Sequence, residues 1–168
     1  MPSTYTPIAT NTLSANTNEV TFSAIPQTYT DLVLEMSVIS ADYTGKYLGI
    51  QFNGDTTTNY SYTLIVGDGA TAVSARDANS PYIYLSAYVS AMTSPVYPMI
   101  GTAHIFRYTS TSILKTVVYR SGQSQSRTMN AVGLWRKSPE AITSIRLYAT
   151  SGNMAAGTTF SLYGVKAA

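Results

Sequence analysis

The chain has one histidine and no cysteine, which limits the chemistry that it could carry. A Ser-His-Asp hydrolase would have to use His104 as its base, but no G-x-S-x-G turn is present to supply the serine. His104 lies in an apolar run, residues 99–108, and is expected to be structural. With a single histidine and no cysteine we expect no zinc site and no disulfide.

The acidic residues offer two other kinds of chemistry. Glycoside hydrolysis needs two carboxylates in a cleft, and Asp31 and Glu35 share one face of a predicted strand. Calcium needs only oxygen ligands, which the segments Asn53-Gly54-Asp55 and Gly67-Asp68-Gly69 contain. Both segments are also ordinary turn sequences, and their spacing matches no EF-hand loop. We predict a protein with no catalytic residue, no cofactor and no bound metal.

Aromatic side chains are the main candidates for binding. The chain has 14 Tyr, 4 Phe and 1 Trp. Trp135, followed by Arg136, could stack on a sugar ring or anchor an interface, or it could close the core at a strand end; core or subunit interface is the favoured interpretation. Tyr82, Tyr84 and Tyr88 alternate along one predicted strand. These five residues form the predicted interface or ligand platform.

Charge and composition exclude several classes of partner. Only 11% of the residues are charged, the net charge is +2, and the basic residues are scattered along the chain. This pattern predicts no nucleic-acid partner. No apolar run is long enough for a membrane helix, so we expect no membrane association. The N-terminus lacks the features of a signal peptide, so we expect the protein to be made in a cytoplasm. Few charges with many tyrosines are typical of a protein that contacts other protein or glycan surfaces, and equally of an ordinary solvent-exposed β-sheet.

The elements that must position these residues are strands. Period-two alternation and turn signals at a spacing of roughly 8–12 residues predict about ten strands. The predicted strands are residues 5–13, 19–25, 31–40, 48–52, 59–66, 82–89, 99–108, 113–121, 131–135, 142–148 and 158–165, whereas residues 70–81 are predicted as a loop. The last strand is expected to lie inside its sheet. Residues 1–13 could be an extended arm or an edge strand, and the edge strand is favoured.

The expected fold is therefore all-β, a single antiparallel β-sandwich over residues 1–168 with the strand order of a jelly roll. The sequence contains no helix-period segment with caps, no domain linker and no repeat of fixed period.

The chain resembles small β-sandwich virion structural proteins of tailed bacteriophages, of the kind found in cyanophages. The segments that carry the resemblance are residues 20–26, 29–34 (YTDLVL), 51–55 (QFNGD), 59–61, 67–69, 115–117, 133–136 and 141–147, and above all the ending 151–168 (SGNMAAGTTFSLYGVKAA). Met154 stands where an aromatic residue is expected, and the loops 41–47 and 70–81 are particular to this chain. No catalytic motif belongs to this pattern.

The resemblance implies a virion component. The leading interpretation is a capsid decoration (cement) protein that binds the major capsid protein or other virion proteins as a homo-oligomer, with a trimer favoured. The alternative is a tail-fibre or spike module that binds a host surface glycan. A third hypothesis, a hydrolase, depends only on unassigned carboxylates.

Overall fold

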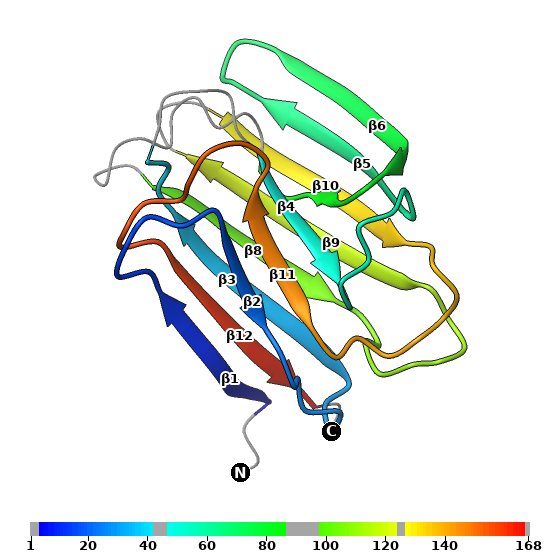
Figure 1. Ribbon diagram of the computed structural model, residues 1–168. Helices are drawn as coiled ribbons and strands as arrows, with labels where there is room; N and C mark the ends of the chain where they lie inside the picture. The colour runs from blue at the N-terminus through cyan, green and yellow to red at the C-terminus, as the bar shows by residue number, and fades with distance from the viewer. Residues whose placement is uncertain (1–3, 42–46, 87–97, 124–126, 167–168) are drawn as a thin grey trace.

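The computed structural model describes residues 4–41, 47–86, 98–123 and 127–166, and these residues form an all-β sandwich. Two antiparallel sheets pack face to face, one of eight strands and one of four (Figure 1). The predicted antiparallel β-sandwich is confirmed. No helix that could span a membrane occurs among the described residues.

The large sheet has the strand order β1-β12-β3-β8-β9-β10-β5-β6. Its strands are β1 (Tyr5–Thr12), β12 (Thr159–Val165), β3 (Asp31–Val38), β8 (Met99–Ile105), β9 (Lys115–Gln123), β10 (Arg127–Trp135), β5 (Tyr60–Gly67) and β6 (Ala72–Ser80). Buried residues alternate with more exposed ones along β9, β10 and β12. One face of this sheet therefore lies on the core and the other faces solvent.

The small sheet has the order β2-β11-β4-β7 and covers only part of the large one. Its strands are β2 (Glu19–Phe22), β11 (Ile145–Ala149), β4 (Leu48–Phe52) and β7 (Ile83–Tyr84). Figure 1 shows β6 at the end of the large sheet, beyond the strands of the small sheet. Eight of the nine residues of β6 are exposed, because this strand overhangs the sandwich.

The strand order can be compared with the predicted jelly roll. With β5, β6, β9 and β10 set aside, the sheets contain β1-β12-β3-β8 and β2-β11-β4-β7. Strands near the two chain ends pair with each other in both sheets, as in two wrapped Greek keys. The order is compatible with a jelly roll, which stays a prediction.

Two sequence predictions about the chain ends are confirmed. The last strand, β12, lies inside the large sheet between β1 and β3. β1 is an edge strand of the same sheet, paired with β12, and its register shifts between Pro7 and Ala9. A proline that cannot donate a hydrogen bond fits such an edge position.

Other strand boundaries need correction. Residues 70–81 are not a loop, because β6 pairs with β5 over most of its length. Of the predicted strand 82–89, the structure describes residues 82–86, and within these the strand is Ile83–Tyr84; residues 87–97 lie outside the described chain. The predicted link at residues 122–127 is shorter than expected, because β9 continues to Gln123 and β10 begins at Arg127.

The core lies between the two inner faces. Its largest fully buried side chains include Trp135, Tyr60 and Phe52, which meet where β10 and β4 end and β5 begins. The Trp135 ring is stacked on Tyr60 at 6.3 Å and tilted against Phe52 at 5.5 Å, measured between ring centroids. This aromatic cluster closes one end of the sandwich.

Candidate functional site

The broadest surface without a covering element is the solvent side of the large sheet, which we call the outer face. It consists of the side chains that point away from the small sheet, and its main members are Thr159, Ser161, Tyr163, Glu35, Ser37, Ile100, Thr102, His104, Val118, Arg120, Thr128, Asn130, Val132, Thr63 and Ile65. No described strand packs over these residues. Few of them are charged.

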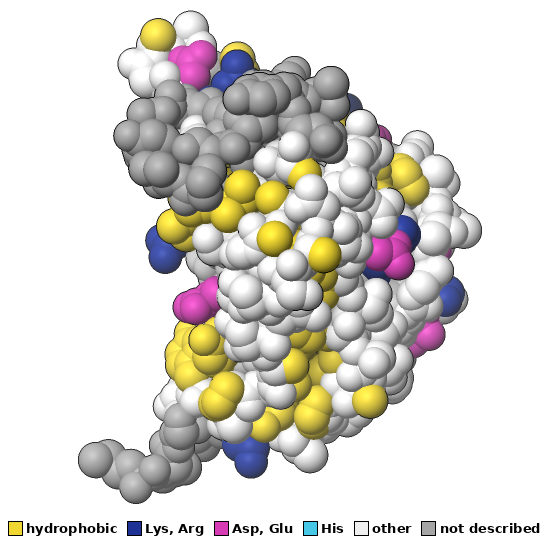
Figure 2. Space-filling view, turned by 60° about the vertical axis from the view of Figure 1, so that its left-hand side comes forward, with side chains coloured by type: hydrophobic (Ala, Val, Ile, Leu, Met, Phe, Trp, Pro, Cys, Tyr) yellow, Lys and Arg dark blue, Asp and Glu magenta, His cyan; other side chains and the backbone are white. Residues whose placement is uncertain are grey.

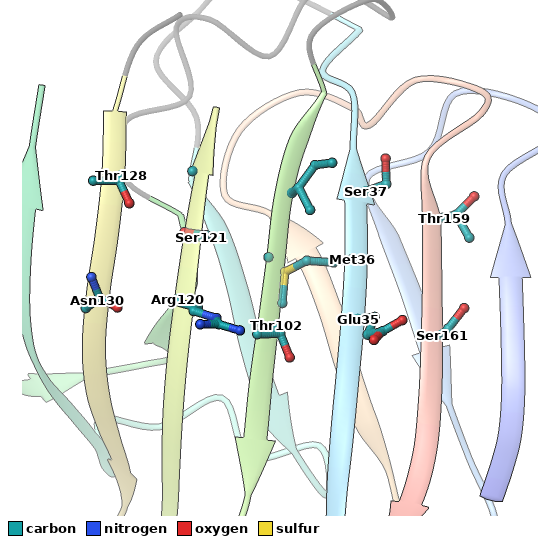
Figure 3. Close-up of a pocket in the computed structure, with 13 residues that line it drawn as sticks. Glu35, Met36, Ser37, Thr102, Arg120, Ser121, Thr128, Asn130, Thr159 and Ser161 are labelled. Atoms are coloured by element: carbon teal, nitrogen blue, oxygen red, sulfur yellow. The ribbon is translucent and has the colours of Figure 1, made fainter. Parts of the chain in front are cut away.

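The pairing register arranges the outer face in rows that cross the strands. The central row contains Ser161, Glu35, Thr102, Arg120, Asn130 and Ile65, each directly opposite the next. Figure 3 shows Glu35 on β3 and Arg120 on β9, on either side of Thr102 on β8. Neither Glu35 nor Arg120 has an ion-pair or hydrogen-bond partner in the part of the chain that the structure describes.

Two shallow grooves cross this face and join at its centre. The first has a volume of about 840 Å³ and is lined mostly by hydroxyl, amide and charged side chains (Figure 3). The second has a volume of about 670 Å³ and reaches towards Tyr5 at one edge and Ile65 at the other. Both grooves include Thr102, Arg120 and Asn130, so the two form one continuous concave surface.

Apolar side chains are exposed on the same face. Ile100 is 61% exposed, Ile65 60%, Val132 48% and Val118 45%. Val118 lies directly opposite Val132, so these two form a cross-strand pair in solvent. Figure 2 shows the molecule from the β1 edge, a different side, where hydrophobic side chains also reach the surface. Clustered apolar side chains on a sheet face are typical of an interaction surface.

His104 also lies on the outer face, where its ring contacts Asp31 and Phe106. Its Nε2 is 3.1 Å from Asp31 Oδ2, and its ring stacks on Phe106 with centroids 4.0 Å apart. The other carboxylate oxygen of Asp31 accepts a hydrogen bond from the backbone N–H of Arg107 at 2.7 Å. Asp31 and Glu35 share a face, as predicted, but Asp31 positions a turn and a histidine. The arrangement supports the structural interpretation of His104.

Trp135 is a core residue, and the prediction of a ligand platform is wrong for it. The side chain is 1% exposed. Its Nε1–H donates to Asp55 Oδ2 at 2.7 Å. A ring buried between two sheets has no face left for a sugar or a partner protein. The favoured interpretation from the sequence is core or subunit interface, and of these two the structure supports the core.

Asp55 is equally part of this buried network. Its carboxylate also accepts hydrogen bonds from the backbone N–H and the hydroxyl of Thr57 and from the amide of Asn59. Burial by itself would raise the pKa of Asp55, but the hydrogen bonds from Thr57, Trp135 and Asn59 together outweigh burial and lower the pKa to about 2. The segment that contains Asp55 is therefore a structural turn that holds Trp135.

The remaining platform residues do not lie together on one surface. Tyr84 is 8% exposed and packs against Tyr47 and Tyr62, so the platform prediction is wrong for it too. Arg136 is exposed, and its guanidinium binds the carbonyl of Ala78 and the side chain of Asn79 at the end of β6.

Tyr82 stays partly at the surface. It lies edge-on to Tyr148, with ring centroids 5.8 Å apart, and both rings lie over Gly49 on the small sheet. The guanidinium of Arg146 lies 4.5 Å from the centre of the Tyr148 ring. Tyr88 lies outside the described residues.

Sequence reasoning missed the outer face, although one signal for it was present. Ile100, Val118 and Val132 occupy strand positions where alternation leads one to expect polar residues. An apolar residue on the predicted wet face of a strand marks a surface that another molecule covers.

Comparison of the chain with protein-family models, with curated proteins and with solved structures finds no match.

Proposed function

We propose that this protein is a non-enzymatic structural component of a bacteriophage particle, a decoration protein that binds the outer capsid surface and stabilises it. The observation that carries the proposal is the outer face of the large sheet, which exposes Ile65, Ile100, Val118 and Val132 around a centre of polar residues. Such a face is suited to binding a protein surface, because burying its apolar side chains is favourable and its hydroxyls and amides can pair across an interface.

The overhang of the large sheet supports the same proposal. β6 pairs with β5 on one side only, and almost all of its residues are exposed. This strand adds surface without adding core. A protein that must bridge neighbouring subunits of a lattice benefits from such a projecting element, since it can reach a second partner while the sandwich is held by the first.

Copy number in purified particles tests the proposal. We expect hundreds of copies per particle, in a simple ratio to the major capsid protein, measured by quantitative mass spectrometry with a known tail protein as internal standard. We also expect particles depleted of this protein to lose their DNA at a lower temperature than complete particles. A copy number of a few to a few dozen, or equal heat resistance with and without the protein, would contradict capsid decoration.

A second candidate function is a tail module that binds a host surface glycan. The observation in its favour is the pair Tyr82 and Tyr148 above Gly49, with Arg146 beside them, because sugar rings stack on exposed aromatic faces. A glycan array prepared from host surface polysaccharides tests it. Binding that is lost in Tyr148→Ala and kept in Tyr5→Ala would support this function, and an array without any signal would exclude it.

A further inference from the structure

The two unpaired charges of the outer face are placed symmetrically about one strand. Glu35 on β3 and Arg120 on β9 each lie directly opposite Thr102 on β8, one from either side. Neighbouring strands are about 4.8 Å apart, so each charge starts about 5 Å from the line of β8. A negative and a positive charge therefore flank β8 at equal distances and at the same height.

We propose that the outer face is a two-fold dimer interface, occupied by a second copy of this chain, with the symmetry axis parallel to β8. This inference rests on the proposed function in taking the outer face as a protein-binding surface, and it names a second copy as the protein bound there, which leaves the free edge of β6 for the capsid. Rotation about such an axis places β9 of the second copy over β3, and β3 of the second copy over β9. Glu35 then faces Arg120 of the second copy, and Arg120 faces Glu35 of the second copy.

The same rotation makes the neighbouring rows complementary. Tyr163 on β12 comes to lie over Val132 of the second copy, and Ser161 lies over Asn130 of the second copy. Ile100 lies on the axis and meets its own equivalent. Neighbouring strands are twisted relative to one another, so the correspondence is closest near the axis, where Glu35, Arg120 and Ile100 lie. Near the axis, polar residues thus face polar residues and apolar ones face apolar ones, whereas at the margin Ile65 lies over Thr10 of the second copy.

The charges favour a second copy over another occupant. A partner with an acidic patch would pair with Arg120 and leave Glu35 buried without a partner, and a basic patch would do the reverse. Burying one unpaired charge is costly. A second copy supplies both opposite charges at once, in the positions where the two-fold axis requires them.

The size of the face is sufficient for a stable dimer. The seven strands from β1 to β5 in the large sheet span about 34 Å at about 4.8 Å per strand, and three rows of outward residues span about 20 Å. The covered area is about 700 Å² per copy, close to the roughly 800 Å² per partner of a standard interface. β6 lies beyond this footprint, so its free edge stays available for a contact with the capsid.

Charge exchange between two variants tests the dimer. Sedimentation velocity should show the wild type as a dimer. Glu35→Arg and Arg120→Glu should each weaken self-association at least about tenfold, because both symmetry-related contacts then join like charges. An equimolar mixture of the two variants should recover the dimer, since one chain then carries basic side chains at positions 35 and 120 and the other carries acidic ones at both. Arg76→Glu, an exposed change on β6 outside the footprint, should leave the dimer intact.

A crosslink provides an independent measurement, because the natural chain has no cysteine. Ile100→Cys places a thiol on the axis, and mild oxidation should join two copies. Ile65→Cys is the matched control: it is equally exposed but three strands from the axis, so it should not crosslink efficiently.

Three results would overturn the dimer: a monomeric wild type at micromolar concentration, a trimer that neither charge variant weakens, or a mixture that does not reassociate. Such a failure is distinguishable from failure of the decoration proposal, since that proposal is decided by the copy number in particles and this one by the purified protein alone. The dimer would also be overturned by a glycan that binds the monomer and whose binding is lost in Arg120→Glu.

Discussion

Replacing Asp55 with alanine is expected to lower the free energy of unfolding by about 3–4 kcal/mol. The substitution removes an acceptor from the indole N–H of Trp135, which is buried in the core, and from Thr57 and Asn59 in the turn. Each buried donor left without an acceptor costs about 1–3 kcal/mol. The loss should also loosen the stacking of Trp135 on Tyr60, because the indole is held in place by this hydrogen bond.

Urea unfolding followed by tryptophan fluorescence measures this effect directly, since Trp135 is the only tryptophan. The control is Asp77→Ala, which removes a carboxylate from the exposed strand β6 and should change stability by less than about 0.5 kcal/mol. A loss below about 1 kcal/mol in Asp55→Ala would show that the buried network does not hold the aromatic cluster.

The same carboxylate should make stability depend on pH in the acid range. The pKa of Asp55 is lowered from 3.8 to about 2 in the folded protein. A lowered folded pKa contributes stability that is fully present above about pH 4 and is lost as the pH falls towards 2. The expected contribution is about 2 kcal/mol, at about 1.36 kcal/mol per pKa unit. Between pH 5 and pH 2.5 the free energy of unfolding should therefore fall less in Asp55→Asn than in the wild type. Equal falls in the two proteins would contradict this assignment.

Gly133→Ala is the second change for which we expect a large effect. Gly133 lies on the inner face of β10, directly against Ile83 of the small sheet. A Cβ at this position would lie 2.5 Å from Cγ2 of Ile83 on β7, and Ile83 is fully buried. Because neither sheet can move away without breaking other contacts, we expect a loss of about 2–3 kcal/mol.

A double-mutant cycle shows whether this clash is the cause. Ile83→Ala removes the atom that an alanine at 133 would meet, at a cost of its own. The double variant should be less destabilised than the sum of the two single changes by about 2 kcal/mol. Gly67→Ala is the matched control, since its Cβ would meet nothing closer than 3.9 Å. Additive effects at 83 and 133 would contradict the close approach.

The sequence predicted most strands because their alternation reflects burial of one face. It identified β2, β3 and β12 from side chains that alternate along the strand, it identified β4, β8 and β9 from apolar runs bounded by turn signals, and it placed β12 inside a sheet. It missed β6 because this strand, AVSARDANS, buries only its last residue, and a strand held mainly by backbone pairing with β5 leaves no apolar pattern to recognise. In the tyrosine-rich segment, alternation indicated a strand but did not fix its length, and the described part of the segment pairs at Ile83–Tyr84.

For the candidate site, the sequence determined which residues have binding chemistry but not which of them face solvent. A tryptophan at a strand end has the same sequence signal in a core as on a surface, and only the approach of Asp55, 80 residues away, decides that Trp135 is buried. Glu35 and Arg120 have no sequence relation; the order β3-β8-β9 places them on either side of one strand.

Composition and alternation by themselves therefore determined an all-β, low-charge sandwich whose last strand lies inside a sheet. Tertiary structure decided which face of each strand is covered, and with it where the unpaired charges and exposed apolar side chains lie. The physical reason is that alternation depends only on neighbours along the chain, whereas exposure of a sheet face depends on which distant strands pair and on how far the second sheet extends over the first.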